Sequence, residues 1–402
     1  MRQIIITISI LLSSVAAMQS QVGKGPELLA YSIVGSVGDS TTPATNATYA
    51  MYGHPEVQQL LLDVAAKPRD RVYVENALHA TGISLGDMVQ NGSIRLDGDV
   101  YKLNLSLLTR SDQEIVRRAT DKYSRALAEA VLARRKNIEA ALRTYDVPTV
   151  DTGAVAFIVL GCFSLDWKGL DLSEESGYIA EPPKRSGGGQ FSVMAEELGG
   201  LALKQIYWGS NTWAAGKYRV TVFGDHFSPG KSITLTPALE FLGDSLWERI
   251  GDVLFALRER PRTADELTAA TKLPSATVQE LLAGMENIGY MRREDGRYVT
   301  LAPVLTSRDQ KMVADLMLLG RDAIKEWLNK DYEPFRESVK EISPLRAGVP
   351  FPDVFAQLWH YIFGIANQKL VEAELFADPY STDHVQKGTA LAVWAPEILG
   401  QQ

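Results

Sequence analysis

Apolar residues recur at intervals of three and four positions in several stretches of the chain, which is the spacing of one helical face. One stretch carries Ile115, Val116, Ala119, Tyr123, Ala126 and Leu127. A shorter stretch carries Val278, Leu281, Leu282 and Met285. Both patterns predict amphipathic helices with one buried side, and the first predicts a long helix over 111–145.

One segment of the chain occurs twice. Tyr101 to Val116 returns as Tyr298 to Val313, so that Tyr, Leu-Thr, Asp-Gln and Val recur at a constant offset of 197 positions. Each copy follows a short helical pattern, an Asp-Gly turn and a strand pattern. Each then continues into a long helical pattern, the second over 308–342. A fixed internal period predicts a duplicated structural unit.

The second copy has the clearer local signals. A helical pattern near Asp244–Arg260 is followed by Thr263 and, three positions later, Glu266, the spacing of a helix-starting capping box. Ser275 opens a third helical pattern. Strand patterns at 290–293 and 297–301 then flank an Asp-Gly turn, which is typical of a two-strand hairpin.

Three helices followed by a β-hairpin resemble a winged-helix domain of the broad kind found in bacterial regulators. The first copy is similar over 84–101, with a third helix, a glycine turn and a wing around Asp97 and Gly98. This fold-level resemblance covers about half of the chain, at 55–146 and 244–343. It implies DNA binding through the third helix, or a protein-interaction module. It also implies that 111–145 and 308–342 pair as an internal pseudo-dimer.

The segment between the copies has a different character. Residues 182–190 contain Pro-Pro and Ser-Gly-Gly-Gly-Gln, which predicts a flexible connection or loop. That run lacks the Gly-Lys-Ser/Thr of a phosphate-binding loop. Three strand-like stretches follow, at 201–208, 217–223 and 232–236, and they predict a small sheet packed on the helical modules.

These patterns together predict an α+β fold that is mainly α-helical. It contains two winged-helix-like modules, each followed by a long amphipathic helix, with a small β-rich insert between the copies. The predicted organisation is a signal peptide at 1–17, a leader or strand region at 18–54, a first module at 55–181, the insert at 182–243 and a second module at 244–402.

The N-terminus bears on localisation. Residues 4–17 are apolar and uncharged, and fourteen residues at ~1.5 Å each span about 21 Å, short of a ~30 Å hydrocarbon core. A cleaved export signal is therefore favoured over a stable membrane span. The alternative is a buried strand of a cytoplasmic protein. The single cysteine, Cys162, lies in an apolar run, which favours burial.

Charge weighs against nucleic-acid binding. The 402 residues carry a net charge of −8, so no overall attraction draws the chain to phosphates. The outward face of the third helix in the second copy carries Thr277, Glu280 and Asn287 but no basic residue. The wing carries Arg292, Arg293 and Arg297. We therefore expect no binding to duplex DNA. The DNA alternative requires contacts from Thr277, Asn287, Arg292, Arg293 and Arg297.

The chain contains no strong catalytic or metal-binding spacing around its five histidines, so no metal and no cofactor is predicted. The densest group of aromatic and polar residues lies in the insert, and it suits sugars or other small ligands if it lines a pocket. Its members are Tyr207, Trp208, Asn211, Trp213, Asp225 and His226. The alternative is a Trp-rich sheet packed against helices.

The sequence therefore favours a secreted or periplasmic, non-enzymatic binding protein built on a winged-helix pseudo-dimer. Its partner would be a protein or a small molecule. One alternative is an intracellular winged-helix transcriptional regulator. A second is an enzyme acting on a small ligand or sugar at the Trp-rich insert.

Overall fold

The computed structural model describes residues 27–34, 43–199, 206–207, 210–223, 248–287, 289–379 and 390–399. The chain divides into two compact units of three stretches each. Unit 1 comprises Met1–Tyr123, Leu170–Gln205 and Leu328–Ile362. Unit 2 comprises Ser124–Gly169, Ile206–Trp327 and Phe363–Gln402. Each unit therefore combines residues from both halves of the sequence.

The first half of the chain runs through short helices and strands into one long helix. Its elements are β1 (Leu29–Val34), α2 (Pro43–Tyr52), α3 (Pro55–Ala66), β2 (Arg69–Asp70), α4 (Arg71–Leu78), α5 (Leu85–Gln90), β3 (Ile94–Asp97), β4 (Val100–Leu103), β5 (Ser106–Leu108) and α6 (Arg110–Leu132). After them come α7 (Arg135–Leu142), α8 (Thr152–Ala156), the π-helical η1 (Phe157–Lys168), α9 (Gly169–Glu175) and β6 (Ser192–Glu197).

The second half has a closely similar order. Its elements are β7 (Ser210–Ala215), β8 (Tyr218–Phe223), α11 (Ile250–Glu259), α12 (Ala264–Thr271), α13 (Ser275–Asn287), β9 (Met291–Glu294), β10 (Arg297–Thr300), β11 (Val304–Leu305), the 3-10 helix η2 (Ser307–Asp309) and α14 (Gln310–Ser338). After them come α15 (Ser343–Arg346), α16 (Phe351–Glu372), β12 (Ala390–Trp394) and the 3-10 helix η3 (Pro396–Leu399).

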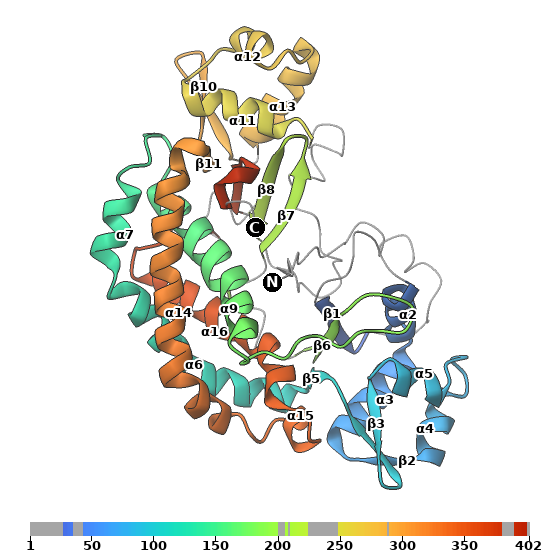
Figure 1. The fold of residues 1–402 in the computed structure, drawn as a ribbon. Coiled ribbons are helices and arrows are strands. Elements are labelled where there is room, and N and C mark those ends of the chain that lie inside the picture. Colours follow the sequence, from blue (N-terminus) through green and yellow to red (C-terminus); the bar gives the residue numbers. More distant parts are fainter. Residues whose placement is uncertain are drawn as a thin grey trace. The chain divides into compact units, whose positions relative to one another are not determined.

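Three helices and a hairpin thus occur twice, in blue to cyan and in yellow to orange in Figure 1. Even a minor pairing recurs, because Arg69 pairs with Tyr101 and Arg262 pairs with Tyr298, the two tyrosines that begin the repeated segments. The predicted α+β, mainly helical fold class is confirmed. The likeness to winged-helix domains stays a prediction.

Local sequence signals account for the boundaries of these elements. The hydroxyl of Thr263 accepts from the amide of Glu266, and the Glu266 carboxylate accepts from the amide of Thr263, which confirms the predicted capping box. The predicted hairpin is confirmed as β9 and β10, paired antiparallel. Asp295 and Gly296 join them with φ values of 48° and 78°, the left-handed conformations that a tight two-residue turn requires.

The two sheets that contain β6 and β12 have similar strand pairings. In unit 1, β6 pairs parallel with β5 and antiparallel with β1. In unit 2, β12 pairs parallel with β11 and antiparallel with β8, which also pairs with β7. The first residues of β6 and β12, Ser192 and Ala390, lie 198 positions apart. In each half, the last strand (β6 or β12) therefore pairs with the strand that precedes the long helix (β5 or β11).

The strands expected in the insert are found only in part. The stretch 217–223 is confirmed as β8. The strand before it is β7, which begins at Ser210, three positions after Tyr207. The expectations at 201–205 and 232–236 lie outside the described residues.

The predicted long helices are present, with one interruption. The stretch 111–145 forms α6 and α7, separated at residues 133–134, and 308–342 contains α14. In unit 1, the rings of Tyr123 and Phe335 pack edge to face with centroids 5.4 Å apart. In unit 2, Arg134 forms an ion pair with Glu326 at 3.0 Å. The predicted stretches 111–145 and 308–342 therefore contact each other within each unit.

One helical stretch among the described residues, Thr152–Glu175, is long and apolar enough to cross a membrane. However, 78% of its most apolar window is buried inside the structure, as in the core helix of a water-soluble domain. It contains Cys162, whose predicted burial is confirmed and raises the pKa of the thiol. The apolar residues 4–17 lie outside the described residues.

Candidate functional site

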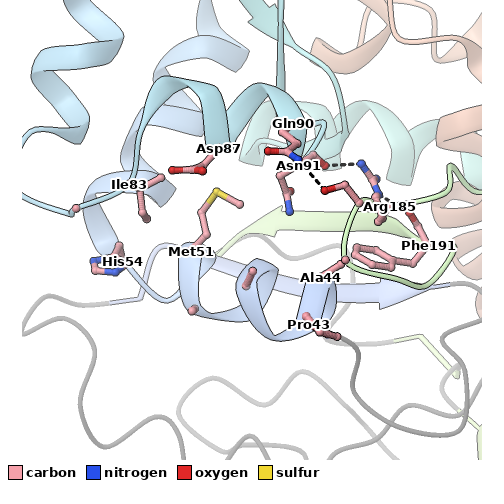
Figure 2. Close-up of a pocket in the computed structure, with 15 residues that line it drawn as sticks. Pro43, Ala44, Met51, His54, Ile83, Asp87, Gln90, Asn91, Arg185 and Phe191 are labelled. Atoms are coloured by element: carbon pink, nitrogen blue, oxygen red, sulfur yellow. Dashed lines mark hydrogen bonds between the residues drawn. The ribbon is translucent and has the colours of Figure 1, made fainter.

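Unit 1 contains a cavity of about 440 Å³. Its walls come from three segments that are distant in the sequence: α2, the stretch from Gly82 to Asn91 that includes α5, and the loop from Arg185 to Phe191. Figure 2 shows Met51 in the middle of the cavity, with Asp87 and His54 toward one end and Arg185 and Phe191 toward the other. This size is within the usual range for small-molecule sites in proteins.

The position of α5 beside the cavity follows from a capping box. The hydroxyl of Ser84 accepts from the amide of Asp87, while the Asp87 carboxylate accepts from the amide of Ser84 at 2.8 Å and from its hydroxyl at 2.7 Å. These hydrogen bonds lower the pKa of Asp87. Asp87 is exposed at one edge of the cavity, so a negative charge lies there at neutral pH.

The loop that forms the third wall is closed by its own backbone. The amide of Arg185 donates to the carbonyl of Gly189 at 3.0 Å, and the amide of Gly188 donates back to Arg185 at 3.1 Å. Gly187 has a φ of 91°, and a Cβ atom there would lie 3.3 Å from the amide nitrogen of Ala44 in α2. Glycine therefore lets this loop pass close to α2, and the segment predicted as a flexible connection forms a wall of the cavity.

The guanidinium of Arg185 is the main electrostatic feature of the cavity. It donates from Nε to the carbonyl oxygen of Phe191 at 3.1 Å and from Nη1 to the carbonyl oxygen of Asn91, and it lies over the Phe191 ring. All these partners are uncharged. Burial lowers the pKa of Arg185, and no ion pair joins it to a carboxylate of the described residues. The cavity thus contains a partly desolvated positive charge.

Uncharged polar groups surround this charge and are held by one another. The side-chain amide of Gln90 donates to the hydroxyl of Ser186 at 2.6 Å, as drawn in Figure 2. The amide of Asn91 donates to the hydroxyl of Thr48 at 2.7 Å, and its oxygen accepts from the hydroxyl of Ser93. These bonds tie α2, α5 and the loop together, so the three walls of the cavity are fixed before any ligand enters.

The lining of this cavity mixes apolar and polar side chains. Within the part of the chain that the structure describes, no group of three His, Cys, Asp or Glu side chains could hold a metal ion. The lining residues combine apolar side chains, such as Met51, Ile83 and Phe191, with the polar groups above. Such a mixture orients a small molecule between apolar walls and a few polar contacts.

The six residues of the insert predicted to bind a ligand can be followed only in part. Trp208, Asp225 and His226 lie outside the described residues, and Asn211 and Trp213 are described by backbone alone, opposite Val222 and Val220. The hydroxyl of Tyr207 donates to Asp378 at 2.9 Å, and the Tyr207 ring packs on Phe223. The proposed ligand site in the insert stays a prediction.

The residues required by the DNA alternative lie on α13 and the β9–β10 hairpin. Asn287 and the three arginines are exposed, and Thr277 is partly buried. Arg292 forms an ion pair with Glu294 at 2.5 Å, and Arg297 forms one with Glu266 at 2.8 Å. Arg293 lies over the ring of Tyr298. Two of the three arginine charges on this hairpin are therefore already compensated by carboxylates of unit 2.

Sequence reasoning missed the cavity in unit 1. Asp87 and Gln90 lie in the stretch 84–101, which the sequence predicts as a third helix and wing, and Arg185 lies in the predicted loop 182–190. The available signal was a basic residue, Arg185, two positions before a run of three glycines. That signal alone did not indicate that the loop packs on α2, because the contact joins residues more than 140 positions apart.

No protein-family model matches this chain, and neither a curated protein nor a solved structure shows significant similarity to it.

Proposed function

We propose that this protein is an exported, non-enzymatic binding protein in which two winged-helix-like modules form an internal pseudo-dimer, and that unit 1 binds a small molecule. The observation that carries the proposal is the cavity of about 440 Å³ beside α5. In this arrangement the third helix of the first module contributes to a ligand site. The exposed residues of this helix are Gly86, Asp87, Val89 and Gln90. They include no Lys or Arg side chain that could pair with a phosphate.

The composition of the units supports the pseudo-dimer. Unit 1 takes Leu328–Ile362 from the second half, and unit 2 takes Ser124–Gly169 from the first half, so the exchange is reciprocal. In unit 1, the amide nitrogen and the hydroxyl of Ser343 donate to the buried carboxylate of Asp112 at 2.8 and 3.1 Å. Such buried contacts between halves are typical of dimers in which each subunit completes the other.

Export is proposed from the apolar residues 4–17, and it is tested by the N-terminal residue of the protein purified from its native cells. A mature start near Met18 in an exported fraction supports the proposal. An intact Met1 in the cytoplasm would contradict it and would favour the alternative of an intracellular regulator.

Ligand binding is tested by filling the cavity. Ala47 lines the cavity from an exposed position on α2, so Ala47→Trp adds bulk there without disturbing a core residue. Asn46→Trp is the matched control, because Asn46 is exposed on the same helix and does not line the cavity. Native mass spectrometry should show a co-purifying small molecule with wild type and with the control, and not with Ala47→Trp. Identical spectra for all three proteins would refute the proposal.

Two other functions remain alternatives to this proposal. A DNA-binding regulator would have to use a wing whose Arg292 and Arg297 already form ion pairs. An enzyme acting on a sugar or another small ligand would have to use the insert, where the side chain of Tyr207 is bound to Asp378.

A further inference from the structure

Resting on the proposed function, the geometry points to a ligand class: a monocarboxylate with an apolar body, whose carboxylate group binds Arg185 and whose other end is neutral or cationic. Three features of the cavity lead to this assignment, namely the unused donors of Arg185, the apolar walls and the position of Asp87.

The first feature is the state of the guanidinium. An arginine carries five N–H donors, and only two of those of Arg185, one on Nε and one on Nη1, bond to described residues. Nη2 bonds to no other residue of the described part of the chain. Because both acceptors are backbone carbonyl oxygens, the bonds hold the guanidinium in place without neutralising it. A fixed, planar and uncompensated guanidinium is suited to a carboxylate.

The second feature is the shape and polarity of the rest of the cavity. Met51 and Phe191 are buried, and Ile83 and Ala47 add further apolar surface to the lining. An inorganic anion would leave most of about 440 Å³ unfilled and would gain nothing from these walls. The side chains of Gln90 and Ser186, next to Arg185, can bond to the oxygens of a bound carboxylate.

The third feature limits the charge of the ligand. Asp87 and Arg185 lie toward opposite ends of the cavity, with Met51 between them (Figure 2). The carboxylate of Asp87 is held in its charged form by Ser84. A second negative charge on the ligand would approach Asp87 and be repelled. The site therefore selects a single carboxylate over a dicarboxylate.

The test compares acids with their primary amides, which have nearly the same shape and no charge. The probes are hexanoate and hexanamide, benzoate and benzamide, and 3-phenylpropanoate and 3-phenylpropanamide, with adipate as the dicarboxylate. Binding to the full chain is measured by saturation-transfer NMR and calorimetry. At least one acid should bind about tenfold or more tightly than its amide, as expected for a charge-assisted hydrogen bond. Hexanoate should bind more tightly than adipate.

Variants assign that preference to one residue. Arg185→Gln should abolish the preference for acid over amide, and Arg185→Lys should keep part of it. Arg118→Gln, which removes an exposed charge on α6 that does not line the cavity, should leave it unchanged. Arg185 also holds the loop through its bonds to Phe191 and Asn91, so Arg185→Gln can unfold the protein. In that case the comparison of acids with amides on the wild-type protein still tests the proposal.

The outcomes separate this inference from the proposed function. If amides bind as tightly as acids and both are lost in Ala47→Trp, the cavity binds small molecules and the carboxylate assignment is wrong. Tighter binding of adipate than of hexanoate would also overturn the assignment. If no probe of either kind binds, both the ligand class and the proposed function fail.

Discussion

The hydroxyl of Tyr361 donates a hydrogen bond to the carboxylate of Glu196, and both side chains are buried in unit 1. The amide of Gln357 adds a second hydrogen bond to the same carboxylate oxygen at 3.2 Å. Phe163 and Trp394, the residues 198 positions away from this pair, pack their rings 5.4 Å apart in unit 2. Positions related by this offset therefore contain a polar pair in one unit and an aromatic pair in the other.

The first prediction is a pH dependence of stability that comes from Glu196. Burial raises the pKa of Glu196 from 4.5 to about 7, so the folded protein binds a proton that the unfolded chain releases between these values. The stabilisation of the folded state by protonated Glu196 is fully present below pH 4.5, and it is lost as pH rises through about 7. Glu196→Gln should therefore be more stable than wild type at pH 8, by up to about 3 kcal/mol, with little difference at pH 4.5.

Urea unfolding at a series of pH values measures this difference. Glu56→Gln, which alters an exposed carboxylate on α3, is the control for loss of one charge. A difference between Glu196→Gln and wild type that does not change with pH would show that folding does not raise the pKa of Glu196.

The second prediction concerns Arg258, which is buried in unit 2. Arg258 forms ion pairs with the buried Asp309 at 3.0 Å and with the exposed Asp146, and its Nε donates to the carbonyl of Val304. Arg258→Met would leave the Asp309 charge buried without its partner, which should destabilise the protein by about 3–5 kcal/mol. Arg260→Gln removes an exposed ion pair with Glu266 and should cost about 1 kcal/mol or less. Equal effects of the two substitutions in denaturant unfolding would contradict this account.

The third prediction follows from the reciprocal exchange between the halves. The chain can be divided into 1–203 and 204–402, within a stretch that joins β6 to β7. Co-expressed halves should purify as one complex, because Gln357 of the second half bonds to Ser106 and Ala195 of the first half inside unit 1. Each half expressed alone should unfold at lower denaturant or aggregate. Two separately folded halves that do not associate in size-exclusion chromatography would contradict the pseudo-dimer.

The fourth prediction is that the β9–β10 hairpin does not bind DNA. Fluorescence anisotropy with a short duplex should detect no binding tighter than the ~10⁻⁴–10⁻⁶ M typical of non-specific contacts. The double variant Glu266→Gln and Glu294→Gln frees Arg297 and Arg292 and should bind more tightly than wild type at about 50 mM salt. Tight, salt-dependent binding by wild type that Arg293→Ala abolishes would support the regulator alternative instead.

Local signals in the sequence determined much of the fold. The Thr263–Glu266 capping box and the β9–β10 hairpin each depend on residues that are only a few positions apart. Their patterns therefore contain nearly all the information that the structure needs at those points. The offset of 197 positions between Tyr101 and Tyr298 likewise predicted two similar sets of elements, because similar sequences form similar local structure.

Tertiary structure alone decided the rest. The hydrogen bond from Tyr361 to Glu196 joins residues 165 positions apart, and the cavity joins α2 and α5 to the loop at Arg185. No local pattern specifies such contacts, because they depend on which surfaces pack once the long helices have formed. The sequence by itself thus determined the elements and their repetition. Packing decided that each compact unit combines residues of both halves. It also decided that the glycine loop packs on α2, which places the charge of Arg185 in a cavity with apolar and polar walls.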